Sequence, residues 1–309
     1  MKLTMHKYRG EDDYWRIREF LRQVFVLNGR RELSWHVAQL DYWRWHLVRN
    51  CWEGGGVGDF TYLWETPEGQ IAAVMNPEDK REAHLHMHPG LRTAELEGEM
   101  LDVAEKRLSL SDPSKERKLR VWSDARDDLR QDILIRRGYV KGDYPGHQRR
   151  RLLSAPILDA PAPEGYTLRA LGDVQELPAR SWASWRAFHP DSPDEDYLGW
   201  DWYQNVQHAP LYRRDLDVMA VAPNGDVASF CTVWYDDVTR SAYFEPVGTA
   251  PEHQRRGLGK AVMCQGLRRL KQMGATLAFV SSYEPPAHAL YASVGFTEYD
   301  LSEPWIKEF

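Results

Sequence analysis

Residues 254–260, with the sequence QRRGLGK, form a basic turn between an apolar run and a helical pattern. Backbone N–H groups at a helix N-terminus have no intrahelical partner, so they can converge on an anion, and the helix dipole adds to the attraction. Gly257 and Gly259 lack a Cβ, which lets a ligand lie directly against the main chain. The spacing matches neither a Walker loop nor the fingerprint G-x-G-x-x-G. The turn therefore predicts a phosphate site of another kind.

Two motifs follow one another in this part of the chain. Residues 254–259 fit the pattern [QR]-x-x-G-x-[GA], and residues 287–296, AHALYASVGF, fit A-x-x-L-Y-x-x-x-G-F. Strand patterns at 242–249 and 276–280 precede the two motifs. Residues 165–309 therefore resemble the GNAT (N-acetyltransferase) superfamily. The resemblance implies an α/β (α+β) fold with a mixed, mostly antiparallel central sheet flanked by helices.

The resemblance also implies acetyl-CoA as co-substrate. In this family the N–H groups of the turn hold the pyrophosphate, and a splayed strand before the turn aligns the pantetheine arm and polarises the thioester carbonyl. The corresponding cofactor-binding residues are Val247, Gly248, Thr249, Gln254, Arg255, Arg256, Gly257, Leu258, Gly259 and Lys260. Glu284 stands where the family often has Asn, which leaves side-chain contacts to the pantetheine open. No metal is expected.

Glu245 and Tyr291 are the candidate catalytic residues. Direct attack by an amine on a thioester needs a base for the ammonium proton, donors for the developing oxyanion and an acid for the leaving thiolate. Many family members carry a catalytic Glu at the position of Glu245, and Tyr291 belongs to the Leu-Tyr pair, so they are the expected base and acid. The alternatives are a Glu245 that pairs with a nearby Arg or faces solvent, and a Tyr291 that only packs.

The first half of the chain repeats the element order of the second. In the first half, strand patterns occur at 2–7, 60–65, 70–74, 83–87 and 119–122, helical patterns at 12–27, 33–48, 94–108 and 126–137, and a final strand pair at 138–153. In the second half, further strand patterns occur at 166–171, 217–222 and 227–235 and helical patterns at 174–186 and 197–208. Ser34 is the expected N-cap of the helix over 33–48.

Local matches between the halves indicate a duplication. RRGY at 136–139 parallels SVGF at 293–296, and LDYWRW at 40–45 parallels YLGWDW at 197–202, both at a separation of 157 residues. Residues 154–164 carry three prolines and no apolar period, which is typical of a linker. We therefore expect two tandem GNAT-like domains, over residues 1–153 and 165–309.

The N-terminal copy lacks the phosphate turn. Its equivalent stretch, residues 87–96, keeps Pro89 where the second half has Pro251, but no R-x-x-G-x-G follows. Three glutamates between residues 95 and 99 would repel a pyrophosphate. We expect this degenerate domain to keep the fold without binding coenzyme A in the usual way, and to complete the substrate cleft or support the fold.

Composition narrows the class of protein. With 309 residues and 42% hydrophobic residues, the chain has material for two packed domains. Cys51, Cys231 and Cys264 are too scattered for a disulfide framework or a C-x-x-C metal site. The chain shows no signal-peptide pattern and no membrane-spanning run, so the cytoplasm is the expected location.

Charge is unevenly divided. Residues 1–153 carry 27 Lys and Arg against 25 Asp and Glu, whereas residues 154–309 carry 13 against 21, giving +2 and −8 within a total of −6. The acidic second half argues against a nucleic-acid partner and is compatible with a cationic substrate. The alternative is that the acidity only keeps the protein in solution.

Acceptor determinants in this fold come largely from the first two helices and the loop between them. Here the loop over 189–197 holds four acids, and Trp182, Trp185, Trp200 and Trp202 flank it. They could receive an amine with apolar bulk, or they are a solvated loop and core aromatics. Asp236 and Asp237 are further candidates. His84, His86 and His88 share one strand face, but without an obvious fourth ligand they are read as a strand face rather than a zinc site.

These observations predict a GNAT-type N-acetyltransferase whose C-terminal domain moves an acetyl group from acetyl-CoA to an amine of a small-molecule or peptide acceptor. No membrane partner is expected, and the oligomeric state is left open. One alternative is a non-catalytic acyl-CoA-binding regulatory module, and another is an enzyme that prefers longer acyl groups. The tandem layout is similar to that of the mycothiol synthases, but no substrate signature fixes the acceptor.

Overall fold

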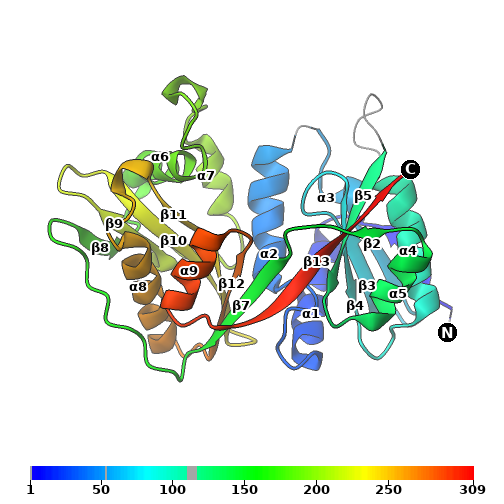
Figure 1. Ribbon diagram of the computed structural model, residues 1–309. Helices are drawn as coiled ribbons and strands as arrows, with labels where there is room; N and C mark the ends of the chain where they lie inside the picture. The colour runs from blue at the N-terminus through cyan, green and yellow to red at the C-terminus, as the bar shows by residue number, and fades with distance from the viewer. Residues whose placement is uncertain (1, 53, 110–116) are drawn as a thin grey trace. The chain divides into compact units, whose positions relative to one another are not determined.

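The computed structural model describes residues 2–52, 54–109 and 117–309, which form two compact units (Figure 1). Unit 1 comprises Met1–Gln148 together with Asp300–Phe309, and unit 2 comprises Arg149–Tyr299. This division departs from the expected domains, 1–153 and 165–309, because the last strand of the chain lies in unit 1. Among the described residues, no helix is long and apolar enough to span a bilayer.

The described part of unit 1 is a sheet of six strands in a row, with the short β6 paired to the last of them, and helices on both faces. Its elements are β1 (Thr4–Lys7), α1 (Glu11–Leu27), α2 (Val37–Tyr42), a π-helical segment (Trp43–Cys51), α3 (Val57–Phe60), β2 (Tyr62–Glu65), β3 (Ile71–Asn76), β4 (Glu82–Met87), α4 (Ala94–Arg107), β5 (Lys118–Asp124), α5 (Asp128–Arg136), β6 (Val140–Lys141) and β13 (Glu298–Glu308). The strand order is β1-β2-β3-β4-β5-β13, and β6 pairs with β13 outside it. Of the neighbours in this order, only β4 and β5 run parallel.

Alternating side chains on β2 show how the two faces of this sheet are used. Tyr62 and Trp64 pack with α4 and α5, whereas Leu63 packs with α1 and α2 on the other face. Successive strand residues point to opposite faces, so a strand that is apolar throughout must be covered on both sides. The order of elements and the mostly antiparallel sheet confirm the predicted fold class.

The start of α2 differs from the prediction. The helix begins after His36, not Ser34, because His36 and Gln39 cap it reciprocally: His36 Nδ1 accepts from the Ala38 N–H at 3.2 Å, and Gln39 Oε1 accepts from the His36 N–H at 2.8 Å. Such a capping box satisfies two helix N–H groups that a lone serine would not. The prediction of Ser34 as N-cap was therefore wrong.

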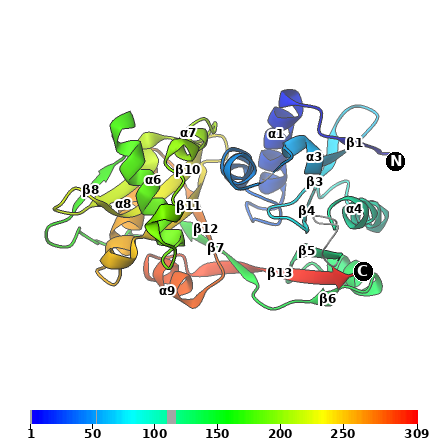
Figure 2. The same cartoon turned by 90° about the horizontal axis from the view of Figure 1, so that it is seen from above.

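Unit 2 repeats the plan with strand order β7-β12-β11-β10-β9-β8 (Figure 2). Its elements are β7 (Gly146–Leu152), whose last residues belong here, β8 (Thr167–Ala170), α6 (Leu177–Phe188), α7 (Asp201–Val206), β9 (Asp217–Val221), β10 (Val227–Asp236), β11 (Ser241–Thr249), α8 (Leu258–Gln272), β12 (Leu277–Ser282) and α9 (Pro285–Ser293), with 3₁₀ turns at Val174–Glu176, Asp194–Asp196, Arg214–Leu216 and Pro251–His253. α8 and α9 pack on one face of the sheet, and α6 and α7 on the other.

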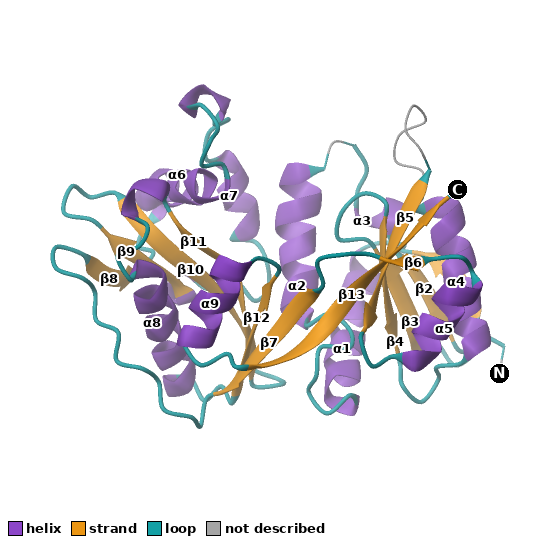
Figure 3. Cartoon of the chain, viewed as in Figure 1, coloured by secondary structure: helices purple, strands orange, loops and turns teal. Residues whose placement is uncertain are grey.

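The strand over residues 298–308 has an unexpected partner. β13 pairs antiparallel with β5, from Ser302 opposite Asp124 to Glu308 opposite Lys118, and β6 pairs with β13 at Val140 and Lys141 (Figure 3). The predicted pairing of two strands within 138–153 was wrong, because β6 joins β13 rather than β7. Trp305, only 5% exposed, lies in the core of unit 1.

The substitution Trp305→Ala tests this placement. Removing a large buried aromatic should lower the free energy of unfolding by about 3–5 kcal/mol. The loss of stability should be confined to unit 1. We expect faster hydrogen exchange in β5 and β2, with α8 and β11 unchanged. Phe309→Ala is the control, since Phe309 is 45% exposed. Equal acceleration in both units would contradict the placement.

Candidate active site

The strands β11 and β12 of unit 2 run side by side for only a short distance. Their parallel pairing covers Ser241, Ala242 and Tyr243, and ends there although β11 continues to Thr249 and β12 to Ser282. A last link joins the Tyr243 hydroxyl to Ser281 Oγ at 2.5 Å. Strand edges that part in this way leave backbone groups for an extended ligand to pair with.

A β-bulge lies on β11 just beyond the point where the strands part. On one side of it Val233 pairs with Phe244, and on the other Cys231 pairs with Val247. Glu245 and Pro246 therefore together oppose Thr232. A proline has no N–H for the ladder, and a bulge re-aims the side chain beside it. The bulge, which sets the direction of the Glu245 side chain, was not predicted, although Pro246 inside a strand pattern is a sign of one.

The Glu245 carboxylate and the Tyr291 hydroxyl are available for chemistry. Neither has a hydrogen-bond partner among the described residues, although Glu245 is half-buried and Tyr291 is 8% exposed. Burial raises the pKa of Glu245 to about 7. Burial, and then the charge of Glu245, raises the pKa of Tyr291 well above its ordinary value, so the phenol stays protonated. Glu245 can therefore accept a proton near neutral pH, and Tyr291 is a phenolic donor close enough to be influenced by the Glu245 charge.

The predicted phosphate turn connects β11 to α8. Within the described chain, none of the backbone N–H groups from Arg255 to Lys260 donates to a protein acceptor, and α8 has no side-chain cap. Arg255 and Gly257 have positive φ, 61° and 82°, which turns the chain at this point. The side chains of Arg255 and Arg256 are exposed. The turn thus offers N–H donors, positive charge and a helix N-terminus to an anion.

Three of the predicted cofactor-binding residues also make contacts within the protein that hold this segment in place. A Cβ on Gly248 would lie 2.4 Å from the Phe230 ring, so only glycine fits there. Thr249 Oγ1 bonds Ser229 Oγ at 2.8 Å. Gln254 Nε2 donates to the Thr249 carbonyl at 3.3 Å, which ties the turn back to the strand. Val247, Leu258, Gly259 and Lys260 lie on the same β11–turn–α8 segment, and all these assignments remain predictions.

The acceptor candidates fall into three environments. Trp200 and Trp202 pack against the apolar cluster under α6 and α7, which places them with the core. Trp182 and Trp185 are partly exposed and stack at 5.3 Å, beside the exposed acids of the 189–197 loop. Asp236 is buried and accepts from the Thr239 N–H and hydroxyl, so it caps a turn rather than facing a ligand.

Unit 1 has different residues at the equivalent catalytic positions. Glu82 and Ala83 of β4 pair with Arg120 and Val121 of β5 as Ser241 and Ala242 pair with Leu277 and Ala278 in unit 2. Counting along β4, His86 occupies the position of Glu245. Each residue of α9 (285–293) lies 157 positions after its counterpart in α5 (128–136). Leu134 is therefore the counterpart of Tyr291. His86 is buried and bonded to Asn76 at 3.2 Å, and burial lowers its pKa.

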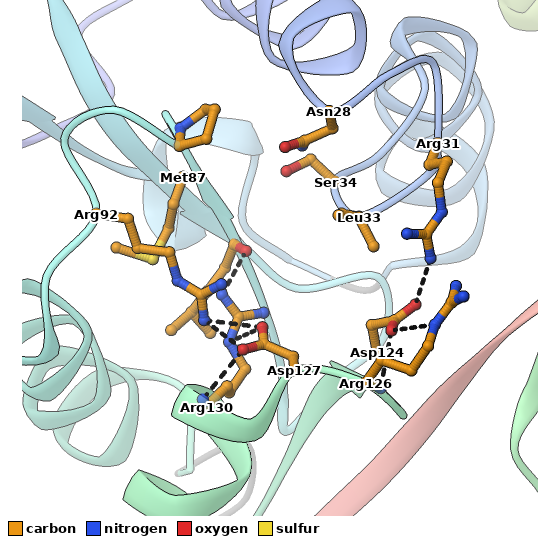
Figure 4. A pocket seen from close by; sticks show the side chains of 12 residues that line it. Asn28, Arg31, Leu33, Ser34, Met87, Arg92, Asp124, Arg126, Asp127 and Arg130 are labelled. Atoms are coloured by element: carbon orange, nitrogen blue, oxygen red, sulfur yellow. Dashed lines mark hydrogen bonds and ion pairs between the residues drawn. The ribbon is translucent and has the colours of Figure 1, made fainter.

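The gap between β4 and β5 in unit 1 is occupied by side chains. Arg130 donates to the Leu85 carbonyl on β4 at 3.2 Å and to the Trp122 carbonyl on β5 at 3.4 Å. Beside it lies a cavity of about 180 Å³, into which Arg92 and Arg130 project together with Asp127, to which both are ion-paired (Figure 4). Thr93 caps α4 by accepting from the Leu96 N–H. These contacts support the expectation that unit 1 does not hold coenzyme A in the usual way.

The three histidines of β4 and its end differ in surroundings. His84 Nε2 lies 3.7 Å from a carboxylate oxygen of Glu78 and 3.9 Å from one of Glu82. The possible ligand atoms of these three residues lie within 4.8 Å of one another. Glu82 is also engaged by Arg120, at 2.5 Å. His86 is sealed in the core, and His88 accepts from the Gly90 N–H at 3.1 Å. The three imidazoles do not form one ligand set, and the expectation of no metal stays a prediction.

Comparison with known proteins agrees with this geometry. Residues 174–296 match the model of the acetyltransferase (GNAT) family. The mycothiol acetyltransferase of Paenarthrobacter aurescens is 27% identical over 248 residues, 75% of this chain and 72% of that protein, and that of Streptomyces bingchenggensis is 27% identical over 256 residues, 77% and 78%. Residues 174–296 thus belong to the acetyltransferase (GNAT) family, and the protein is an acyltransferase.

Solved structures of other proteins share the fold of this chain over nearly its whole length. A GCN5-related N-acetyltransferase from Sphaerobacter thermophilus superposes with a TM-score of 0.65 at 18% identity, covering 99% of this chain and 95% of that one. A tandem GNAT protein from the clavulanic acid biosynthesis pathway gives 0.67 at 15% identity, covering 99% and 98%. Both likenesses cover nearly the whole chain, so this protein has the fold of a tandem GNAT protein.

The raised pKa of Glu245 predicts a pH-dependent effect on stability. Because the folded state binds this proton more tightly than the unfolded state, stability is lost as pH rises from about 4.5 through about 7. Glu245→Gln should remove that loss, raising Tm at pH 8 by about 2 °C or more and leaving it unchanged at pH 4. The control is Glu298→Gln at an exposed site. A lower Tm for Glu245→Gln at pH 8 would show that the carboxylate is stabilised in the fold.

Proposed function

We propose that unit 2 transfers the acetyl group of acetyl-CoA to a primary amine of a small-molecule acceptor. One observation carries this proposal: the turn and Glu245 lie at the two ends of one segment that has parted from its neighbouring strand. Neither the N–H groups of the turn nor the Glu245 carboxylate has a partner in the part of the chain that the structure describes. A pyrophosphate at the turn and a thioester near Glu245 would be joined by an arm that runs along the free edge of β11.

Binding would use backbone more than side chains. The N–H groups from Arg255 to Lys260 would hold the pyrophosphate, with Arg255 and Arg256 adding charge. The free edge of β11 at Val247 and Gly248 would pair with the amides of the pantetheine arm, as an added strand does. The absence of a Cβ at Gly248 lets the strand lie against Phe230 on its other side.

The chemical step would divide between the two candidate residues. Glu245, with a pKa of about 7, takes a proton from the acceptor ammonium, directly or through water. The neutral amine then forms a C–N bond to the thioester carbon, backbone N–H groups of β11 stabilise the oxyanion, and the C–S bond breaks. Tyr291 donates its proton to the departing thiolate, which leaves as free CoA, and the extra proton on the new C–N nitrogen returns to the Tyr291 phenolate to give the neutral amide.

The relatives suggest the first acceptor to try. The curated relatives named mycothiol acetyltransferases span most of this chain, so a mycothiol-related amine heads the acceptor panel. The acidic loop over 189–197 favours a cationic acceptor over an anionic one. A location in the cytoplasm, where acetyl-CoA is made available to such enzymes, fits the same proposal.

Catalysis is tested by CoA release over a panel of amines. Glu245→Gln should lower kcat about 10²–10⁴-fold at pH 7.5, and Tyr291→Phe should lower it with little change in the KM for acetyl-CoA. For wild type, kcat/KM should rise with pH through about 7. Tyr144→Phe, an exposed tyrosine of unit 1, is the matched control. Acetyl-CoA binding without turnover of any amine would favour the regulatory binding module instead.

The turn is tested separately by Gly257→Ala. No atom lies near enough to hinder a Cβ there, but φ is +82°, so alanine strains the turn and displaces its N–H groups. We expect the affinity for CoA to fall about 5–30-fold and the affinity for acetyl-pantetheine, which lacks the pyrophosphate, to stay unchanged. Gly98→Ala, in an open part of α4, is the control. Equal losses for both ligands would place the pyrophosphate elsewhere.

A further inference from the structure

A fully buried ion pair joins α6 to β9, and β9 is separated by β10 from β11, the strand that carries Glu245. Arg180 on α6 and Asp217 on β9 are both 0% exposed, and Arg180 Nε donates to Asp217 Oδ1 at 2.9 Å. The hydroxyls of Tyr203 and Tyr212 also donate to the Asp217 carboxylate. The carboxylate is therefore held from several sides, which keeps the guanidinium in one orientation.

Arg180 contacts two residues of β10 that in turn contact β11. Its Nη2 donates to Thr232 Oγ1 at 3.0 Å, and Thr232 is the residue opposite the bulge at Glu245 and Pro246. Its guanidinium carbon lies 3.8 Å from the centre of the Phe230 ring, and that ring abuts Gly248. One side chain thus contacts the residue opposite the bulge and, two positions before it on β10, the ring that lies against Gly248.

We propose that the Arg180–Asp217 pair is a positioning device for the reaction: through Thr232 it fixes the bulge that aims Glu245, and through Phe230 it fixes the backbone at Gly248. This inference rests on the proposed acetyl transfer in unit 2. Arg180 and Asp217 are positioning residues, since both are sealed from solvent and act through β10.

Stability alone is a weak reason for a buried ion pair at this place. Apolar residues of similar volume often replace such pairs at no cost in stability, whereas removing one partner leaves a buried charge uncompensated. The planar fork of Arg180 gives what an apolar side chain lacks, a directed bond to Thr232 together with a flat contact on Phe230. A catalytic carboxylate needs placement within a fraction of an ångström, and such placement comes from supporting hydrogen bonds.

The pH dependence of the reaction reports on the same geometry. Tyr291 on α9 is close enough for the charge of Glu245 to raise its pKa, and Thr232 of β10 lies opposite Glu245 in the ladder. With Arg180 replaced, the bulge would relax toward solvent, and the pKa of Glu245 would fall from about 7 toward its ordinary value. The acidic limb of the kcat/KM profile would move to lower pH, an effect that a loss of stability by itself does not produce.

The test replaces the pair as a unit, with Arg180→Met combined with Asp217→Leu. We expect a folded protein whose Tm falls, because the Tyr203 and Tyr212 hydroxyls lose their acceptor, with a CoA affinity reduced at least about tenfold and an acidic limb moved down by about one pH unit. The control is Arg18→Met with Asp41→Leu, a buried ion pair of unit 1 that lies 2.9 Å apart. It should leave CoA affinity and the pH profile unchanged.

Two further variants keep the proposal open to refutation if the double variant does not fold. Thr232→Val removes the link to the bulge but keeps the ion pair, and should move the acidic limb without weakening CoA binding as much. Arg180→Lys keeps the charge without the fork and should restore stability but not the pH profile.

The outcomes separate the two hypotheses. Wild-type kinetics in folded double and Thr232→Val variants would overturn the positioning role and leave the proposed acetyl transfer intact. A wild-type protein that neither binds CoA nor releases it from acetyl-CoA would refute the proposed function itself.

Discussion

The structure of unit 2 depends on the separation of two parallel strands after only three paired residues. Where β11 parts from β12, no strand in the described part of the chain pairs with that edge of β11, so its backbone can pair with a ligand. The bulge at Glu245, the glycine at 248 and the uncapped start of α8 all lie along this freed segment. Each of them makes room for, or directs a group toward, a ligand that completes the sheet.

Unit 1 shows what happens when the same separation is closed from within. There Arg130 bonds carbonyl groups on both strands, Thr93 caps the following helix, and a buried His86 replaces the glutamate. The polar groups that a ligand would satisfy in one repeat are satisfied by side chains in the other. The first repeat has thus kept the fold, but its own side chains form the backbone hydrogen bonds that a ligand would form in the second repeat.

Local patterns in the sequence predicted the turn, the strand before it and the Leu-Tyr pair, because each depends on residues close together in the chain. The Arg180–Asp217 pair was missed because it joins residues far apart in sequence, whereas the bulge was missed although Pro246 is a local sign of it. An isolated glutamate among apolar residues was visible, but its lack of a partner was not. The strand at residues 298–308 was not predicted, and a pattern of alternation would not have said which sheet it joins.

The position of β13 has a consequence for the order of events during synthesis. Domains near the N-terminus usually fold while the rest of the chain is still being made. Here the sheet of unit 1 takes its last strand from residues 300–309, so this sheet can close only after translation of the second repeat has finished. Until then the edge of β5 is an unpaired strand edge, exposed to pairing with other chains. The degenerate repeat, although made first, is completed last.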